Sequence, residues 1–413
     1  MLNWLLFGFL FLLLFGMTRY DRRLYGNYFS PVAVLGWPLL LLLSLALIAA
    51  EPLGFLPLRP DVLILCIFAL PVFWLGSLVW SVILPKSLLR TAVSRFQYVF
   101  PIRQAPLKWT MLILSWLIII LMLLSLMRAV GSSLSLSAMG TDEFTYAYSG
   151  SGWAGHVLVL AILALIYLIG IVRKTDFLTL VTIMLLIVLL LLQQVKTWLY
   201  VPLVGGILLR FYNLRKIRVN PILLVTGLAA GVALFFLTYY FAVGIDEGDF
   251  ARKNYNIARH FLGYVFAGVL GFGEHMQRGL PVGELPEVLF MPLINLWKFI
   301  TGQPVSGVVS NYHVWIDVKS QVDVNVKTFP GTIYIHGGMI WGLVYLFLAG
   351  CMLYFNWILA SLSKNYWFTV LYILLAAPLA LGWFDFYYNQ LTFIELPVIL
   401  VVIAFLSHKK ADV

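Results

Sequence analysis

Long apolar runs recur along almost the whole chain, and they constrain its fold more than any other feature. A run of about 20 apolar residues crosses a bilayer as a helix, because every backbone polar group then finds its partner within the helix. The composition agrees, since 62% of the 413 residues are hydrophobic and only 11% are charged. In soluble domains roughly a quarter of the residues are charged. The sequence therefore predicts an all-α, polytopic membrane protein.

These runs predict 11 membrane-spanning helices. They lie near residues 2–17, 31–49, 61–84, 109–128, 153–172, 177–194, 197–210, 221–243, 337–358, 366–383 and 391–407. Residues 1–243 then hold the first eight spans, 244–336 form one large outer loop, and 337–413 hold the last three spans and a tail. Two apolar stretches in the loop, 261–273 and 288–300, are short for a span and are interpreted as re-entrant or interfacial helices. If both cross, the count becomes 13.

The basic residues fall in short clusters between the apolar runs, although the net charge of +10 could suggest a nucleic-acid partner. Such clusters are typical of cytoplasmic loops that face anionic lipid, so we expect no nucleic acid. Alternating spans place the clusters at 19–23, 86–108, 173–174, 210–218 and 409–410 on one side. The sequence thus predicts a periplasmic N-terminus, a periplasmic large loop and a cytoplasmic C-terminus.

Ionisable residues gather between Gly244 and Gly338, where the apolar pattern is interrupted. These 95 residues hold eight of the 17 acidic residues and four of the six histidines. Because ionisable side chains are costly in hydrocarbon, this interval should meet water and carry any chemistry. The acidic segment 246–249 comes after a predicted span and is interpreted as a solvated turn rather than a metal site. No metal and no cofactor are predicted.

The interval closes on the most informative pattern in the chain. It runs Asn-Val-Lys-Thr-Phe-Pro-Gly-Thr-Ile-Tyr-Ile-His-Gly-Gly and is followed by a helix with small residues that ends near Gly350. The pattern resembles a stretch of the bacterial oligosaccharide repeat-unit polymerases, the Wzy-type O-antigen and exopolysaccharide polymerases. Where that family often has an acidic residue, this chain has His336. The positions of the loop motif that carry the resemblance are Asn325, Thr328, Gly331, Tyr334 and Gly338.

The resemblance implies a GT-C-like membrane glycosyltransferase of the bacterial inner membrane, with short helices in its large periplasmic loop. Its donor and acceptor would both be oligosaccharides linked to undecaprenyl pyrophosphate. A hydroxyl of one unit would attack the anomeric carbon of another, and lipid pyrophosphate would leave. The resemblance also allows a flippase and a chain-length regulator of the same pathway as partners, besides the lipid bilayer.

A departing pyrophosphate needs positive charge rather than a general acid, because its oxygens gain electrons as the bond breaks. Arginine meets it with a bidentate fork and lysine with a point charge. The predicted pyrophosphate-binding residues are Lys196, Arg252, Arg259 and Arg278. In a helix, Arg252 and Arg259 would share one face, two turns apart. The alternative is that these cations reach lipid headgroups and have no catalytic role.

The attacking hydroxyl needs a base. The candidate catalytic residues are His336, His313, Asp317 and Asp323, because histidine titrates near neutral pH and carboxylates can be tuned upward. His336 is preferred, since the glycines beside it would let a ligand approach the backbone closely. The alternative is that His336 only hydrogen-bonds a loop carbonyl.

Other functions stay open at this point. An O-antigen ligase would use the same donor with a lipid A core acceptor. A flippase or transporter of the lipid-linked sugar would carry ionisable residues along a path through its helices. The centres of the predicted spans are nearly free of charge, which favours an enzyme. A scaffold without catalytic activity would tolerate the loss of both Arg252 and Arg259.

Overall fold

A computed structural model describes most of the chain. The described residues are 1–96, 107–132, 148, 153–173, 175–192, 196–214, 229, 231–233, 235–237, 250–307, 309, 311–363 and 365–408. They fall into two compact units, unit 1 with residues 1–98 and 262–413, and unit 2 with residues 99–261. The acidic segment 246–249, most of the predicted span 221–243 and most of the connection between the predicted spans 109–128 and 153–172 lie outside the described residues.

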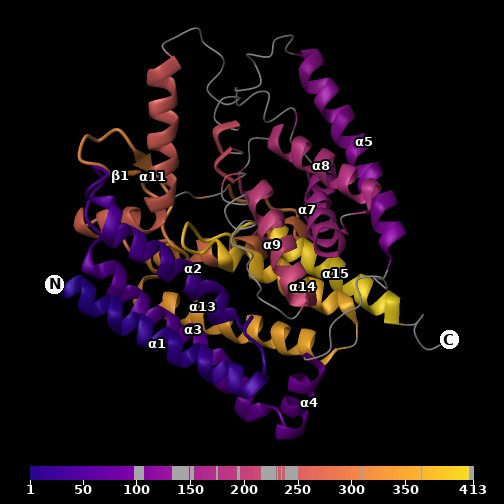
Figure 1. The fold of residues 1–413 in the computed structure, drawn as a ribbon, viewed down its shortest axis with the longest axis horizontal. Coiled ribbons are helices and arrows are strands. Elements are labelled where there is room, and N and C mark those ends of the chain that lie inside the picture. The colour runs from indigo at the N-terminus through magenta and orange to yellow at the C-terminus, as the bar shows by residue number, and fades with distance from the viewer. Residues whose placement is uncertain are drawn as a thin grey trace. The chain divides into compact units, whose positions relative to one another are not determined.

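Unit 1 consists of helices joined by short turns and one longer loop region (Figure 1). Its elements are α1 (Leu2–Tyr25), α2 (Pro31–Leu45) with a π-helical extension η1 (Ala46–Ala50), α3 (Pro60–Ile83), α4 (Lys86–Phe96), the second half of α11 (Phe250–Gln277), the 3-10 helix η4 (Pro286–Phe290), α12 (Met291–Ile300), α13 (Phe329–Leu362), α14 (Tyr366–Ala380) and α15 (Thr392–His408). A short antiparallel hairpin pairs β1 (Val314–Trp315) with β2 (Asp323–Val324).

Unit 2 contains four further helices among its described residues, α5 (Lys108–Ser132), α7 (Trp153–Ile171), α8 (Phe177–Leu192) and α9 (Lys196–Leu214). The guanidinium of Arg210 on α9 donates to the carbonyl of Val172 at the end of α7, at 2.7 Å. Lys108, at the start of α5, forms an ion pair of 2.6 Å with Asp176, which precedes α8. These two contacts join helix ends that are far apart in the sequence.

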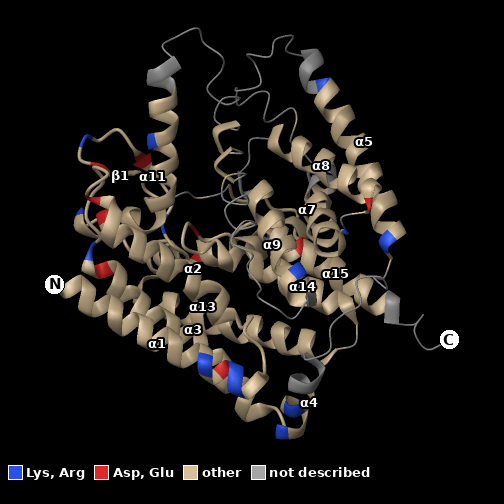
Figure 2. Cartoon of the chain, in the orientation of Figure 1, with Lys and Arg blue, Asp and Glu red and all other residues tan. Residues whose placement is uncertain are grey.

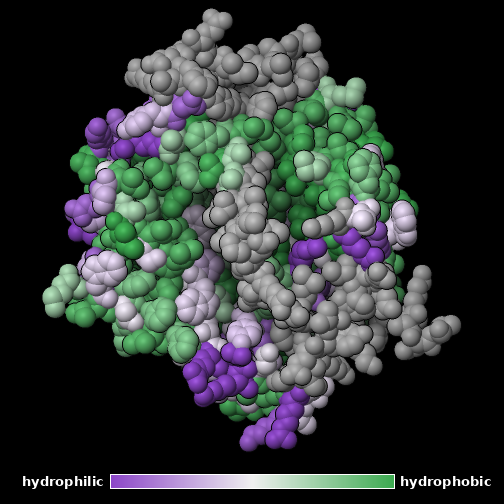
Figure 3. Space-filling model, in the orientation of Figure 1, coloured by the Kyte–Doolittle hydropathy of each residue, from purple (hydrophilic) through white to green (hydrophobic). Residues whose placement is uncertain are grey.

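The helices confirm the prediction of an all-α membrane protein. Five helical segments among the described residues are long and apolar enough to cross a bilayer. They are Leu2–Tyr25, Pro31–Ala50, Pro60–Ile83, Lys108–Arg128 and Phe329–Leu362, and shorter apolar helices cover Val159–Ile171, Phe177–Leu192, Tyr366–Ala380 and Thr392–Leu406. Apolar side chains cover much of the described surface in Figure 3. In water such a surface would be unstable, whereas lipid tails cover it without penalty.

The tightest helix crossing in unit 1 lies between α3 and α13. A Cβ placed on Gly76 would lie 2.4 Å from the carbonyl carbon of Gly350, and one placed on Gly350 would lie 2.0 Å from the carbonyl oxygen of Phe73. No side chain fits at either position. The two backbones touch there because small residues let membrane helices pack closely without a hydrophobic driving force.

Contacts at one end of unit 1 join several connections that are far apart in sequence. Asn3 donates to the carbonyl of Leu58 at 2.7 Å, and the backbone N–H of Leu56 donates to the carbonyl of Ile316 at 2.9 Å. The backbone N–H of Phe329 donates to the carbonyl of Gly382 at 2.6 Å. We call this end the loop end; its described residues lie within 1–3, 51–59, 274–328 and 381–391.

The other end of the α1, α3 and α13 helices carries a buried carboxylate. Asp21 accepts hydrogen bonds from Trp74 Nε1 at 3.0 Å, Ser77 Oγ at 2.6 Å and Tyr354 Oη at 2.6 Å. Its side chain is fully buried. Each donor comes from α3 or α13, so the carboxylate fixes three helices against one another. Figure 2 shows charged residues of unit 1 near β1 and α11, and again near α4 and the end of α1.

Helix α13 begins earlier than the sequence pattern predicted, at Phe329 instead of near 337. Thr328 caps it by accepting a hydrogen bond from the backbone N–H of Gly331, and Pro330 occupies the first turn, where its missing N–H has no consequence. Gly331 and Tyr334 are therefore helical, not loop residues as expected. The helix is interrupted at Gly338, where φ is 61° and ψ is −159°.

Helix α11 is also longer than expected. The apolar stretch 261–273, interpreted as a short re-entrant or interfacial helix, is part of a continuous helix of 28 residues. The residues that precede the stretch are compatible with helix, so nothing stops the helix there. The second expected short helix, 288–300, coincides with η4 and α12.

The α3 and α13 crossing predicts the effect of one added methyl group. Gly350→Ala should destabilise the protein by about 1–3 kcal/mol, because the methyl group meets rigid backbone. Gly16→Ala is the matched control, since no atom lies within 4 Å of a Cβ at this span position. Thermal unfolding of the detergent-solubilised variants measures both. Equal midpoints for the two variants would contradict the close approach.

Candidate functional site

The loop end gathers the ionisable residues of unit 1 that could do chemistry. They come from three places, namely the hairpin β1 and β2 with the segment after it, the C-terminal end of α11, and the connection between α14 and α15. We call this group the loop-end cluster. It consists of His275, Arg278, His313, Asp323, Lys327 and Asp385.

His313 and Asp323 form a dyad on the hairpin. The Nδ1 of His313 lies 2.6 Å from Oδ2 of Asp323. The hairpin register places the pair, because Val314 lies opposite Val324 and Trp315 opposite Asp323. The imidazole is 61% exposed and the carboxylate 35% exposed, so a ligand can reach both. A carboxylate at Nδ1–H holds the tautomer whose Nε2 accepts protons, as a general base requires.

Lys327 is a buried cation close to this dyad. Its side chain is fully buried, and its Nζ donates to the carbonyl of Tyr312 at 3.1 Å. Burial lowers the pKa of Lys327 to about 8, while the charges of Asp385 and Asp323 oppose the shift. The positive charge of Arg278 lowers the pKa further. Two cations are thus held close enough to repel each other.

Asp385 is the principal counter-charge of Lys327. Desolvation raises the pKa of its carboxyl to about 6, against hydrogen bonds from the backbone of Phe386 and the hydroxyl of Thr332 that lower it. The Thr332 hydroxyl donates to Oδ1 of Asp385 at 2.8 Å. Asn311 in turn donates to the Thr332 oxygen at 3.2 Å. The carboxylate therefore links the first turn of α13 to the connection between α14 and α15.

His275 lies between the buried lysine and the loop after α11. Its Nε2 is 3.0 Å from the carbonyl of Pro281, and its ring lies 6.0 Å from the ring of Tyr312. Burial lowers the pKa of His275, and the charge of Lys327 lowers it further. The pKa shift favours neutral His275, whose Nε2–H can donate to the Pro281 carbonyl.

The preferred catalytic candidate, His336, lies in a different environment from the one expected. It is inside α13 and only 5% exposed. The kink at Gly338 instead receives the loop after α11, because the backbone N–H of Gly283 donates to the carbonyl of Ile335 at 2.7 Å. A catalytic role for His336 stays a prediction, while His313 has the more accessible geometry.

The hydrogen-bond partners of Asp317 argue against its predicted role as a base. Its Oδ1 accepts the backbone N–H groups of Gln321 at 2.8 Å and Val322 at 2.9 Å. The residue is buried and holds the turn of the hairpin. These hydrogen bonds turn the carboxylate into the loop. Its function is to shape the loop that presents His313.

The predicted cations are distributed over both units. Arg278 comes directly after α11 in unit 1, where its Nε donates to Glu274 at 2.8 Å and its side chain is 40% exposed. Arg252 and Arg259 both lie in α11, seven residues apart as expected, but in the part that belongs to unit 2. Lys196 is the first residue of α9, also in unit 2. The role of these three residues in phosphate binding stays a prediction.

Sequence reasoning missed His275 and the two buried charges of the cluster, Lys327 and Asp385. Lys327 stands at the variable position of the Asn-Val-x-Thr pattern, directly before the residue that caps α13. Asp385 is the single acidic residue in the aromatic run 383–388. The signal available for both buried charges was a single charged residue at the junction of a polar loop and an apolar helix. Burying a charge there costs free energy, so such a residue indicates a functional role.

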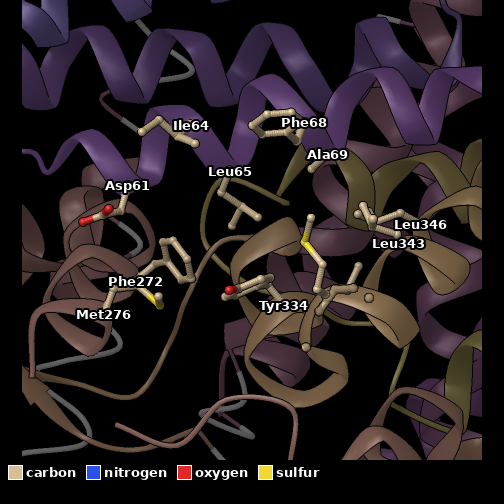
Figure 4. A pocket seen from close by; sticks show the side chains of 14 residues that line it. Asp61, Ile64, Leu65, Phe68, Ala69, Phe272, Met276, Tyr334, Leu343 and Leu346 are labelled. Carbon is tan, nitrogen blue, oxygen red and sulfur yellow. The ribbon is translucent and has the colours of Figure 1, made fainter. Parts of the chain in front are cut away.

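An apolar groove runs along unit 1 from the loop end. It has a volume of about 250 Å³ and is enclosed by α3, the C-terminal half of α11 and α13. Figure 4 shows Leu65 and Phe68 of α3 on one side, and Phe272 of α11 and Tyr334 of α13 on the other. Asp61 marks its end nearest the loops.

The fold and the site define a helical membrane protein with a polar, partly buried cluster at one end of an apolar groove. Residues 55–413 match a family of unknown function, DUF6337, and the chain belongs to this family. No curated protein and no solved structure matches the chain.

The buried charge of Lys327 predicts a pH-dependent stability difference. Its pKa is lowered from 10.5 to about 8 in the folded state, so the unfolded chain binds more protons between these values. The contribution of Lys327 to stability is therefore present above pH 10.5 and lost as the pH falls through about 8. Compared with Lys327→Met, the wild type should gain up to about 3 kcal/mol over this range.

Unfolding midpoints of the two proteins between pH 7 and pH 10 measure this difference. Lys319→Met, which removes an exposed lysine of the same loop, is the control and should stay close to the wild type throughout. A wild type that loses stability relative to Lys327→Met as the pH rises would mean that the pKa of Lys327 is raised, which contradicts its burial.

Proposed function

We propose that this protein polymerises oligosaccharide repeat units linked to undecaprenyl pyrophosphate, as an O-antigen or exopolysaccharide polymerase of the Wzy type. The observation that carries the proposal is the loop-end cluster, in which an exposed histidine–carboxylate dyad lies close to a buried lysine and a partly exposed arginine. A base and a cationic site are the two components that this glycosyl transfer requires. The resemblance of the segment 325–338 supports the same reaction class.

In this proposal His313 is the general base. Its Nε2 takes the proton from the attacking hydroxyl of the acceptor sugar, while Asp323 at Nδ1 stabilises the imidazolium that forms. The oxygen then forms a bond to the anomeric carbon of the donor. The bond from that carbon to the pyrophosphate oxygen breaks, and its electron pair leaves with the lipid pyrophosphate.

The cations of the cluster compensate the charge that develops on the leaving group. Arg278 has an exposed guanidinium that can bind a phosphate oxygen. Lys327 acts from beneath the surface, where its charge is less screened than a surface charge would be. The two cations repel each other, and a bound dianion relieves this repulsion. The site therefore binds a dianion in preference to water.

The proposed setting is the bacterial inner membrane, with 11 spans, a GT-C-like architecture, a periplasmic N-terminus and a cytoplasmic C-terminus. Support comes from unit 1, where the start of α1 and the large loop meet at the loop end. The basic residues at 19–23 and 86–90 lie at the far ends of α1 and α3. By the positive-inside rule, the loop end then faces the periplasm.

A single purified lipid-linked repeat unit tests the reaction with the full-length protein in lipid nanodiscs. The wild type should produce a ladder of polymers without any other acceptor. His313→Ala should lower the initial rate by a factor of about 10²–10⁴, the usual contribution of a general base. Asp323→Asn should have a smaller effect, because the imidazole remains. His156→Ala, an exposed histidine on α7, is the control and should retain the wild-type rate.

The same assay separates the alternatives. A product that forms only when lipid A core is added would identify a ligase instead. Unchanged rates for His313→Ala would remove the dyad from the mechanism even if polymer forms. Movement of the lipid-linked unit across the membrane with no new glycosidic bond would identify a flippase.

A further inference from the structure

The groove between α3, α11 and α13 originates in the way α3 and α13 cross. The two backbones are in contact at Gly76 and Gly350. The groove begins one to two turns from this contact, at Ala69 and Leu346, and continues toward the loop end as far as Asp61. The groove therefore lies beside the contact between α3 and α13, on the side toward the loop end, and α11 closes it from one side (Figure 4).

The lining of the groove is apolar, and part of it faces the surroundings. Phe68 is 60% exposed and Met339 is 62% exposed, whereas Ala69, Leu346 and Phe272 at its base are buried. Because α3 and α13 are long enough to span a bilayer, the medium outside this opening is hydrocarbon. An apolar chain can enter from the membrane without crossing water.

The end of the groove at the loop end is surrounded by charges. A Cβ on Gly273 would lie 3.0 Å from Cβ and Cγ of Arg59, so the stem of this arginine packs on α11 just beyond the groove. Arg278 lies two residues beyond lining residue Met276, at the same helix end. Asp61 and Glu274 are also present, but Glu274 is bonded to Arg278. Only Nε of Arg278 is bonded to Glu274, and the stem of Arg59 reaches the same end, so two guanidinium groups that can bind phosphate through several N–H donors lie there.

We propose that this groove binds the isoprenoid tail of a polyprenyl diphosphate, with the diphosphate held at Arg59 and Arg278. The inference rests on the proposed function, which supplies a substrate of this class. An engineered cavity of about 150 Å³ holds a benzene ring. A groove of about 250 Å³ therefore takes on the order of ten carbon atoms, or two isoprene units.

The groove also explains how the substrate is oriented for the dyad. A tail fixed between α3 and α13 places the diphosphate at the membrane surface, on the same end of unit 1 as the hairpin with His313. The sugar attached to the diphosphate then extends from the membrane toward the polar loop. Binding energy from the tail is used to position a reacting carbon that lies outside the groove.

A sugar-free polyprenyl diphosphate with a photoreactive group in its second isoprene unit tests this site in the full-length protein in nanodiscs. Cross-links mapped by mass spectrometry should fall within 61–69, 272–276 and 333–346. Leu65→Trp fills the groove and should lower the cross-linking at least ten-fold. Leu12→Trp adds the same ring at a position on α1 that is 66% exposed and should not change it.

Cross-links that fall mainly outside these segments, or equal labelling of the two tryptophan variants, would overturn the proposal. The same holds if a phospholipid carrying the photoreactive group in its acyl chain labels the groove as strongly at equal concentration, because the site would then be a general lipid contact. A polymer ladder without labelling of the groove would refute the tail site alone. Labelling without a ladder would refute the polymerase and leave the site.

Should Leu65→Trp fail to fold, the wild-type protein still decides the question. Unlabelled polyprenyl diphosphate should displace the probe, whereas a polyprenyl alcohol without phosphates should displace it at least ten-fold less well. Equal displacement by both compounds would show that Arg59 and Arg278 do not hold the diphosphate.

Discussion

The contact between the backbones of α3 and α13 at Gly76 and Gly350 determines most of the architecture of unit 1. Because no side chain separates the helices at that point, they pack at close range. On one side the carboxylate of Asp21 joins them to α1 through three hydrogen bonds. On the side toward the loop end lies the groove, which α3, α13 and the C-terminal half of α11 enclose.

The start of α13 is the second fixed point of the architecture. Thr328 caps the helix, its own backbone N–H donates to the carbonyl of Gly268 on α11 at 3.3 Å, and Phe329 donates to Gly382. Lys327 is held inside by its position directly before this junction. The ammonium group of Lys327 is therefore buried in a place where desolvation disfavours its charge. Such buried charges are expected at sites that bind an anion.

The sequence predicted the class of fold from local properties. Apolar runs are read directly as helices, so α2 with η1, α3 and α5 lie close to their expected bounds, whereas α1 continues past residue 17 to Tyr25. Boundaries set by long-range contacts were missed. The start of α13 depends on a cap at Thr328 and on the partners of that cap in α11, which no local pattern reveals. The length of α11 was missed because its first half is polar and its second half apolar, a change that hydropathy interprets as a boundary.

The site shows the same difference between properties that are local in sequence and contacts that only the fold creates. His313 and Asp323 were both candidates, but only the hairpin register brings their side chains together. Asp317 was chosen for its residue type, and its hydrogen bonds to the backbone give it another role. Lys327 and Asp385 could be found only from burial and from the charges that surround them, which a sequence does not contain.

The central claim is that the cations of the loop end receive the diphosphate of a lipid-linked sugar beside His313. A cryo-electron microscopy structure of the full-length protein in nanodiscs with a non-hydrolysable lipid-linked sugar diphosphate tests this most directly. We expect phosphate oxygens within about 3 Å of Arg278 or Arg59, and the sugar on the side of His313. Phosphates bound only by cations of unit 2, or at the end of unit 1 that carries Asp21, would contradict it.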